Sequence, residues 1–181
     1  SRRGARCGPP RPPVAKGATG GHTDLQRLKA GGVGAVFFAA YVPKMFVETN
    51  RSANYALQAI DAIRHDIVER YPNDFELAGK ADDIVAARKR GKIAVMIGLE
   101  GGHAIEDSPR LLRDYYALGA RYMTLTHTNT NNWAGSSGDE KGKTTGLNAL
   151  GRQVVAEMNR NGMMVDISHT SDKTFFDALE A

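Results

Sequence analysis

The sequence has little cysteine and no long hydrophobic run, and both shortages restrict what the chain can be. Its one cysteine, Cys7, cannot form an internal disulfide, so the chain is not a small disulfide-stapled domain. The longest apolar run, Val33–Val42, is too short to cross a bilayer. The first residues, SRRGARCGPP, have no apolar stretch behind them, so no secretory signal is predicted. A cytoplasmic and a secreted protein both remain open.

An excess of positive charge is also absent from most of the chain. The formal net charge is +4, but residues 1–21 contain five basic and no acidic side chains, which leaves −1 for residues 22–181. The same segment holds four of the seven prolines, so we predict a disordered Arg/Pro/Gly-rich tail over residues 1–21. The tail has no aromatic side chain that could stack on bases, so no nucleic-acid partner is predicted.

Strand-like and helix-like segments alternate along the rest of the chain. The predicted strands are Val33–Val42, Lys92–Leu99, Arg121–Thr126 and Met163–Ser168, all short and largely apolar. The predicted helices are Ser52–Arg70, Ala81–Arg90, Pro109–Leu118, Leu147–Asn161 and Ser171–Leu179. No hairpin signal joins two strands, so the fold class is α/β with four βα units and a parallel sheet. Such a sheet is either small and open or half of an eight-stranded barrel.

Three metal-capable side chains follow three successive predicted strands. They are Glu100 in LEGGH, His127 in LTHTN and His169 in DISHT. In parallel α/β folds ligands bind beyond the carboxyl ends of the strands, so we expect these side chains to share one rim. A carboxylate with imidazoles favours zinc or a similar divalent ion, which makes bound water acidic enough to supply hydroxide.

Other polar residues have plainer interpretations. His103 is predicted to be a solvated loop histidine, with a role beside a metal ligand as the alternative, and His65 is interpreted as structural. Trp133 either walls the site or is buried against a neighbouring loop, and Asp166 either orients a ligand histidine or points into the barrel. The glycine-rich stretches match no phosphate-binding spacing, so no nucleotide site is predicted.

Three long motifs carry a family resemblance. They are HTDLQRLKAGGVGAVFFAAYVP, IGLEGGHAIEDSPRLLRDYYALGARYMTLTHTNTNNWA and GLNALGRQVVAEMNRNGMMVDISHTSDKTFFDAL, and they occur in order over residues 22–181. They resemble the membrane (renal) dipeptidase family of zinc metallopeptidases, including its bacterial members. The resemblance implies a (β/α)₈ TIM barrel with two Zn²⁺ ions joined by a carboxylate, and a dipeptide as substrate.

The resemblance also implies roles for the three rim residues. Glu100 resembles the carboxylate that bridges both zinc ions, and His169 resembles the first histidine of the second zinc. His127 is similar to the histidine that contacts the substrate and stabilises the oxyanion. The family holds an H-x-D pair at the end of its first strand. Here His22 and Asp24 stand in a different motif, so they are not assigned as ligands, and Asp24 or Thr23 is expected to cap a helix or turn.

The expected domain is therefore the amino-terminal half of the barrel, over residues 22–181, in a fragment of a dipeptidase. An open half barrel exposes sheet edges and apolar faces, which favours aggregation or a homodimer. We expect the complete protein to be a dipeptidase and the isolated chain to be weakly active or inactive. Two alternatives stay open: a non-catalytic truncated relative that only binds partners, and a barrel metallohydrolase of other amides such as β-lactams or acyl-amino acids.

Overall fold

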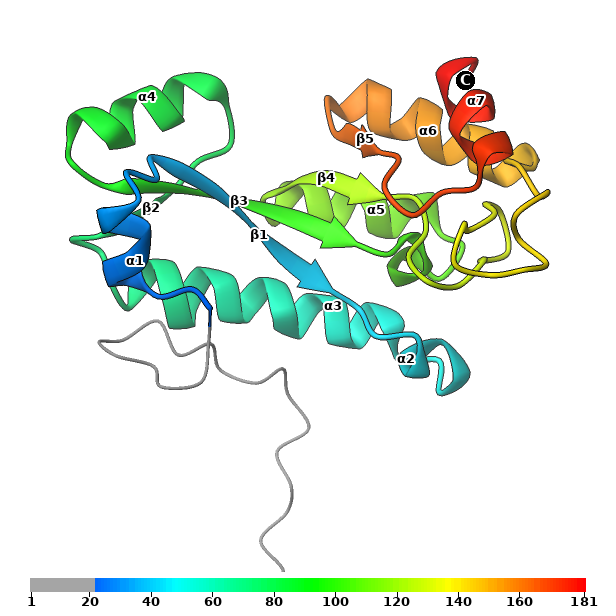
Figure 1. The fold of residues 1–181 in the computed structure, drawn as a ribbon, viewed down its shortest axis with the longest axis horizontal. Helices are drawn as coiled ribbons and strands as arrows, with labels where there is room; N and C mark the ends of the chain where they lie inside the picture. Colours follow the sequence, from blue (N-terminus) through cyan, green and yellow to red (C-terminus); the bar gives the residue numbers. More distant parts are fainter. Residues whose placement is uncertain (1–21) are drawn as a thin grey trace, which may run out of the picture.

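The computed structural model describes residues 22–181 (Figure 1), so the tail predicted over residues 1–21 lies outside the described residues. The strands are β1 (Ala35–Tyr41), β2 (Phe75–Leu77), β3 (Ile93–Glu100), β4 (Ala120–Thr124) and β5 (Met164–Asp166). The α-helices are α1 (Leu25–Ala30), α2 (Met45–Glu48), α3 (Ser52–Asp61), α4 (Ala81–Lys89), α5 (Pro109–Ala117), α6 (Ala149–Asn161) and α7 (Asp172–Leu179). A π-helical segment, η1 (Ala62–Glu69), continues α3, and a 3₁₀ turn, η2 (Gly102–Ile105), follows β3.

The strands form one parallel sheet in the order β1-β3-β4-β5. These are the four strands expected from the sequence, so the parallel α/β fold is confirmed. The sequence prediction missed β2, because three residues are too few to show a pattern. Phe75 of β2 pairs with Ile93 at the start of β3, whereas β4 pairs with β3 from Ile97 onward. The two strands therefore follow one another along the same edge of β3.

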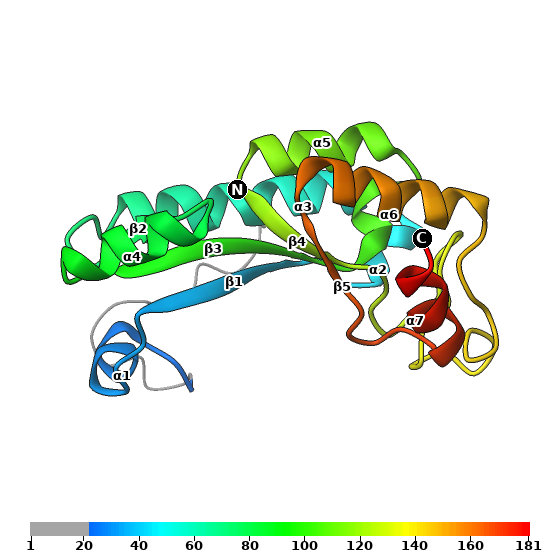
Figure 2. The same ribbon diagram turned by 90° about the horizontal axis from the view of Figure 1, so that it is seen from above.

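One face of the sheet carries most of the hydrophobic core. Alternate residues of β3, among them Val95, Ile97 and Leu99, are fully buried there. They belong to one cluster with Ile60 of α3 and Leu112 of α5, and Figure 2 shows α3, α5 and α6 together on this side of the sheet. A smaller cluster on the other face packs α4 against the beginning of β3. Because both faces are covered there, β3 reads as a continuous apolar run.

The helices agree with the sequence prediction with a few corrections. The helix predicted over Ser52–Arg70 changes to π-helical geometry at Ala62, which apolar spacing cannot reveal. The prediction missed the short helix α2, and it expected a helix or turn to start near Asp24 without giving the range of α1. Asp24 caps α1 by accepting a hydrogen bond from the Arg27 amide at 2.8 Å, as the helix-start interpretation expected. No helix within residues 22–181 has both the length and the apolar character needed to cross a bilayer.

Tyr115 connects α5 to the turn that follows β3. Its side chain is fully buried, and its hydroxyl donates a 2.9 Å hydrogen bond to the carbonyl of Ala104 in η2. Because Ala104 lies only four positions beyond Glu100, this bond fixes the chain close to the end of β3.

Removing the Tyr115 hydroxyl should therefore destabilise the protein. Tyr115→Phe leaves the buried Ala104 carbonyl without its partner, and we expect a loss of about 1–2 kcal/mol in the free energy of unfolding, measured by urea denaturation. Tyr116→Phe is the matched control. The ring of Tyr116 packs under the Arg121 guanidinium, and phenylalanine keeps that ring. Equal losses in the two variants would contradict this role of the Tyr115 hydroxyl.

Candidate metal centre

The carboxyl ends of four strands form one row of polar and aromatic side chains. Tyr41 is paired with Glu100, Glu100 with Thr124, and Thr124 with Asp166. Paired positions on neighbouring parallel strands place their side chains on the same face of the sheet. The register therefore sets a phenol, two carboxylates and a hydroxyl side by side at one edge, where ligands bind in this class of fold.

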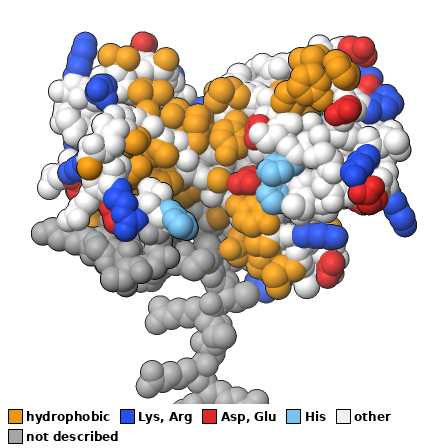
Figure 3. Space-filling model, in the orientation of Figure 1, with side chains coloured by type: hydrophobic (Ala, Val, Ile, Leu, Met, Phe, Trp, Pro, Cys, Tyr) orange, Lys and Arg blue, Asp and Glu red, His pale blue; other side chains and the backbone are white. Residues whose placement is uncertain are grey.

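The structure brings together the three residues that the sequence singled out. Glu100, His127 and His169 each offer one ligand atom, and these atoms all lie within 4.8 Å of one another. Glu100 Oε1 lies 3.1 Å from His127 Nε2, and the two imidazole rings lie 4.3 Å apart. In Figure 3 histidine side chains lie against an acidic side chain near the middle of one face, with hydrophobic side chains close by.

Exposure differs among the three side chains. The side chain of His127 is 17% exposed and that of Glu100 is 26% exposed, whereas His169 is an exposed residue. The group is therefore partly desolvated but open to an ion or substrate from one side. A carboxylate and two imidazoles are donors that zinc accepts in proteins, so the chemistry of the group fits that metal.

Tyr41 was not singled out in the sequence, yet it lies beside the same group. Its ring lies 4.7 Å from the ring of His127, at a tilt of 55°. Tyr41 ends β1 as Glu100 ends β3, but the strand predicted over Val33–Val42 includes Tyr41, so the position after a strand does not point to it. It supplies an aromatic wall next to the imidazole.

Asp166 shapes the turn that leads to His169. Its carboxylate accepts hydrogen bonds from the Thr124 hydroxyl at 2.6 Å and from the amide and hydroxyl of Ser168 at 3.0 and 2.7 Å. Partial burial raises the pKa of Asp166, but these hydrogen bonds outweigh the burial and hold the pKa below its ordinary value. Asp166 therefore holds the strand end and the turn rather than standing free in the interior.

His103 is the main correction to the sequence interpretation. It was expected to be solvated, but it is only 6% exposed, and its Nε2 lies 2.8 Å from the carbonyl of Val42. Because that carbonyl can only accept, Nε2 carries the proton. Burial lowers the pKa of His103 in spite of this bond, which keeps the ring neutral at pH 7. His103 thus ties the β3 turn to the end of β1.

Trp133 is buried against the same turn, which was one of the two expected alternatives. A Cβ atom at Gly102 would lie 2.5 Å from the Trp133 ring and 2.4 Å from the carbonyl of Leu125. The neighbouring Gly101 has a φ of 110°, which residues with a side chain rarely adopt. The two glycines after Glu100 therefore serve close packing and a backbone turn.

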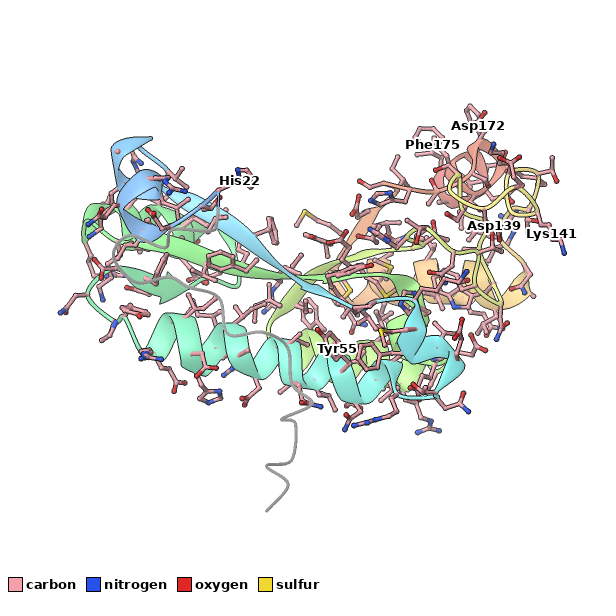
Figure 4. All side chains as sticks on the ribbon, turned by 60° about the horizontal axis from the view of Figure 1, so that its bottom comes forward. His22, Tyr55, Asp139, Lys141, Asp172 and Phe175 are labelled. Atoms are coloured by element: carbon pink, nitrogen blue, oxygen red, sulfur yellow. The ribbon has the colours of Figure 1, made fainter. Side chains whose placement is uncertain are left out.

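The remaining histidines lie away from the group. His65 lies on η1, where its exposed ring lies 3.0 Å from an Asp61 carboxylate oxygen and 3.5 Å from one of Glu69. Figure 4 places His22 near α1, at the opposite end of the molecule from Asp139 and Asp172. His22 is thus separated from the carboxyl edge, and leaving it unassigned agrees with its position.

A parallel sheet with this donor group at its carboxyl edge is typical of the TIM-barrel class of metal-dependent hydrolases. The family model of the membrane dipeptidases, peptidase family M19, matches the sequence over residues 13–181. The match therefore includes the last nine residues of the segment 1–21. The chain belongs to this family.

Curated relatives and solved structures agree with this assignment. The chain is 43% identical to dipeptidase verJ of Clonostachys rogersoniana over 162 residues, which are 84% of the chain and 42% of the relative. It is 42% identical to dipeptidase 3 of Rattus norvegicus over 167 residues, 90% of the chain and 33% of the relative. It also resembles a metallopeptidase from Rhodobacter sphaeroides liganded with a phosphinate mimic of L-Ala-D-Ala, with a TM-score of 0.79 and 25% identity over 93% of the chain and 55% of the other. The chain thus spans well under half the length of these two curated relatives.

The hydrogen bonds of Asp166 give a testable pH dependence. A carboxylate whose pKa is lowered by folding stabilises the native state fully above the unfolded value, about 3.9, and this stabilisation is lost as the pH falls through the folded pKa. We expect Asp166→Asn to lower the free energy of unfolding by about 1–3 kcal/mol at pH 7, and the difference from the wild type to shrink toward pH 3.

Urea denaturation at both pH values measures this difference. Asp114→Asn, on the exposed face of α5, is the control and should change the free energy of unfolding by less than about 0.5 kcal/mol. A loss for Asp166→Asn that stays constant down to pH 3 would contradict the assignment.

Proposed function

We propose that the chain forms part of a zinc-dependent dipeptidase, with Glu100 and His169 as metal ligands and His127 as the residue that contacts the substrate. The observation that carries the proposal is the convergence of these three donors within 4.8 Å at the carboxyl edge of the sheet, in a member of the membrane dipeptidase family. The assignment of two Zn²⁺ ions, with Glu100 as the bridging carboxylate, belongs to the same proposal.

Bound zinc would supply a Lewis acid and water acidic enough to yield hydroxide at neutral pH. Glu100 and His169 would hold the metal, since ionised carboxylate oxygens and neutral imidazole nitrogens are zinc ligands. Partial burial of Glu100 strengthens its attraction for a cation relative to a fully exposed carboxylate.

His127 is suited to stabilising negative charge on the substrate. Its Nε2 faces a carboxylate oxygen at 3.1 Å, so this nitrogen carries a proton that it can donate. With Glu100 engaged as a metal ligand, this N–H group would be free to donate to a carbonyl oxygen that gains negative charge as water adds to the scissile peptide bond. The ring of Tyr41 lies against His127 and limits where the imidazole can move.

The class of substrate rests on the relatives. Two are named dipeptidases, and the Rhodobacter sphaeroides structure holds a mimic of a dipeptide. Dipeptides are therefore the first substrates to test, and β-lactams and acyl-amino acids form the comparison panel.

Metal titration tests the ligands. We expect zinc binding to the purified chain, followed by calorimetry, to weaken at least tenfold in Glu100→Gln and in His169→Asn, because each variant removes a donor from a small set. His65→Asn is the matched control, since His65 is exposed on η1 and should leave the affinity unchanged. Wild-type affinity in both ligand variants would reject these two residues as ligands.

Hydrolysis of alanine dipeptides of both stereochemistries tests the activity. We expect the 181-residue chain to be at most weakly active with zinc, because only Glu100 and His169 are assigned as its metal ligands. Release of alanine can be followed by chromatography, with Glu100→Gln as the inactive control. Rapid zinc-dependent hydrolysis that Glu100→Gln abolishes would establish that this chain suffices, and faster turnover of a β-lactam would change the substrate class.

A further inference from the structure

Ser136 lies in the loop after β4 and touches the backbone of both candidate site histidines. Its side chain is fully buried. Its Oγ donates a hydrogen bond to the carbonyl of His127 and lies 3.2 Å from the carbonyl of His169. The same oxygen accepts a hydrogen bond from the Gly138 amide at 3.1 Å. A hydroxyl has one proton, so it donates to one carbonyl at a time, and it lies between the two segments that present the imidazoles.

The backbone at His169 needs such support. Its φ is 63°, in the left-handed region, which residues with a side chain rarely adopt unless their surroundings hold them there. The His169 carbonyl is held by the Ser137 amide at 2.9 Å and by the Thr126 hydroxyl at 3.0 Å. The Ser137 hydroxyl approaches the same oxygen at 3.1 Å.

The loop after β4 and the turn after β5 are joined around Ser136 by further backbone contacts. Ser136 and Thr170 form an antiparallel bridge, and the Ser171 amide donates to the Gly135 carbonyl at 2.9 Å. Of the joining groups, the Ser136 hydroxyl is the one whose oxygen reaches the carbonyls of His127 and His169 together. It therefore lies where it can hold the two carbonyls close to each other.

We propose that Ser136 is a positioning residue of the metal centre, whose hydroxyl fixes the separation and orientation of His127 and His169. This inference rests on the proposed function for its consequence, which is tighter metal binding through His169, the one of the two histidines that is proposed as a ligand. Its structural part concerns the protein without metal and can be tested separately. Partners that orient metal ligands contribute about 10- to 100-fold to metal affinity.

The first test compares zinc affinities by calorimetry. We expect Ser136→Ala to bind zinc at least tenfold more weakly than the wild type. Ser171→Ala is the matched control: Ser171 is also a buried serine, caps α7 and contacts the Thr145 carbonyl at 2.5 Å, yet its hydroxyl bonds neither histidine carbonyl. It should lose comparable stability and keep the wild-type affinity. An equal loss of zinc affinity in both variants would mean that Ser136 only stabilises the fold, and it would overturn the proposal.

The second test needs no metal. Nuclear Overhauser effects between the rings of His127 and His169, whose centroids lie 4.3 Å apart, should be present in the wild type and in Ser171→Ala and should weaken in Ser136→Ala. Ser136→Cys, which fills the space but donates only weakly, gives the same comparison if Ser136→Ala does not fold. Unchanged ring contacts in a folded Ser136 variant would overturn the inference. Absence of zinc binding by the wild type would instead count against the proposed function.

Discussion

The parallel register of the sheet is the constraint on which the candidate centre depends. Because Tyr41, Glu100 and Thr124 end their strands in register, their side chains stand in one row across three strands, and Asp166 extends it. Apolar residues buried against α3 and α5 hold that register, since a shift of one residue would turn the core side chains of β3 to the other face. The position of Glu100 is therefore a consequence of the packing of Ile97 and Leu99.

Glycine and aromatic packing then fix the segment beyond β3. Gly102 has no side chain because Trp133 and the Leu125 carbonyl occupy that space, and the buried His103 ties the turn to β1. The tryptophan comes from the loop after β4, so the two loops stabilise each other. The base beneath Glu100 is thus made of residues outside the group of Glu100, His127 and His169.

The loops that carry the histidines are held differently, by hydrogen bonds to their backbone. His169 adopts a left-handed conformation. Its carbonyl oxygen accepts hydrogen bonds from Thr126 and Ser137, and the Ser136 hydroxyl lies within hydrogen-bond distance of it. Asp166 secures the other side of the same turn through Ser168. A polar loop can place an imidazole accurately only if such contacts restrict its backbone, because it has few apolar side chains to bury.

The sequence alone determined the parallel α/β class, the four main strands and the three donors, because apolar runs, turn residues and the position after a strand are local properties. It also favoured the capping role of Asp24, which depends on residues three positions away. The burial of His103, the change to π-helical geometry at Ala62 and the contacts of Ser136 were decided only in the tertiary structure. Each depends on groups distant in sequence or on backbone geometry, such as Val42 for His103 and the carbonyl of His169 for Ser136, and no local pattern records such contacts.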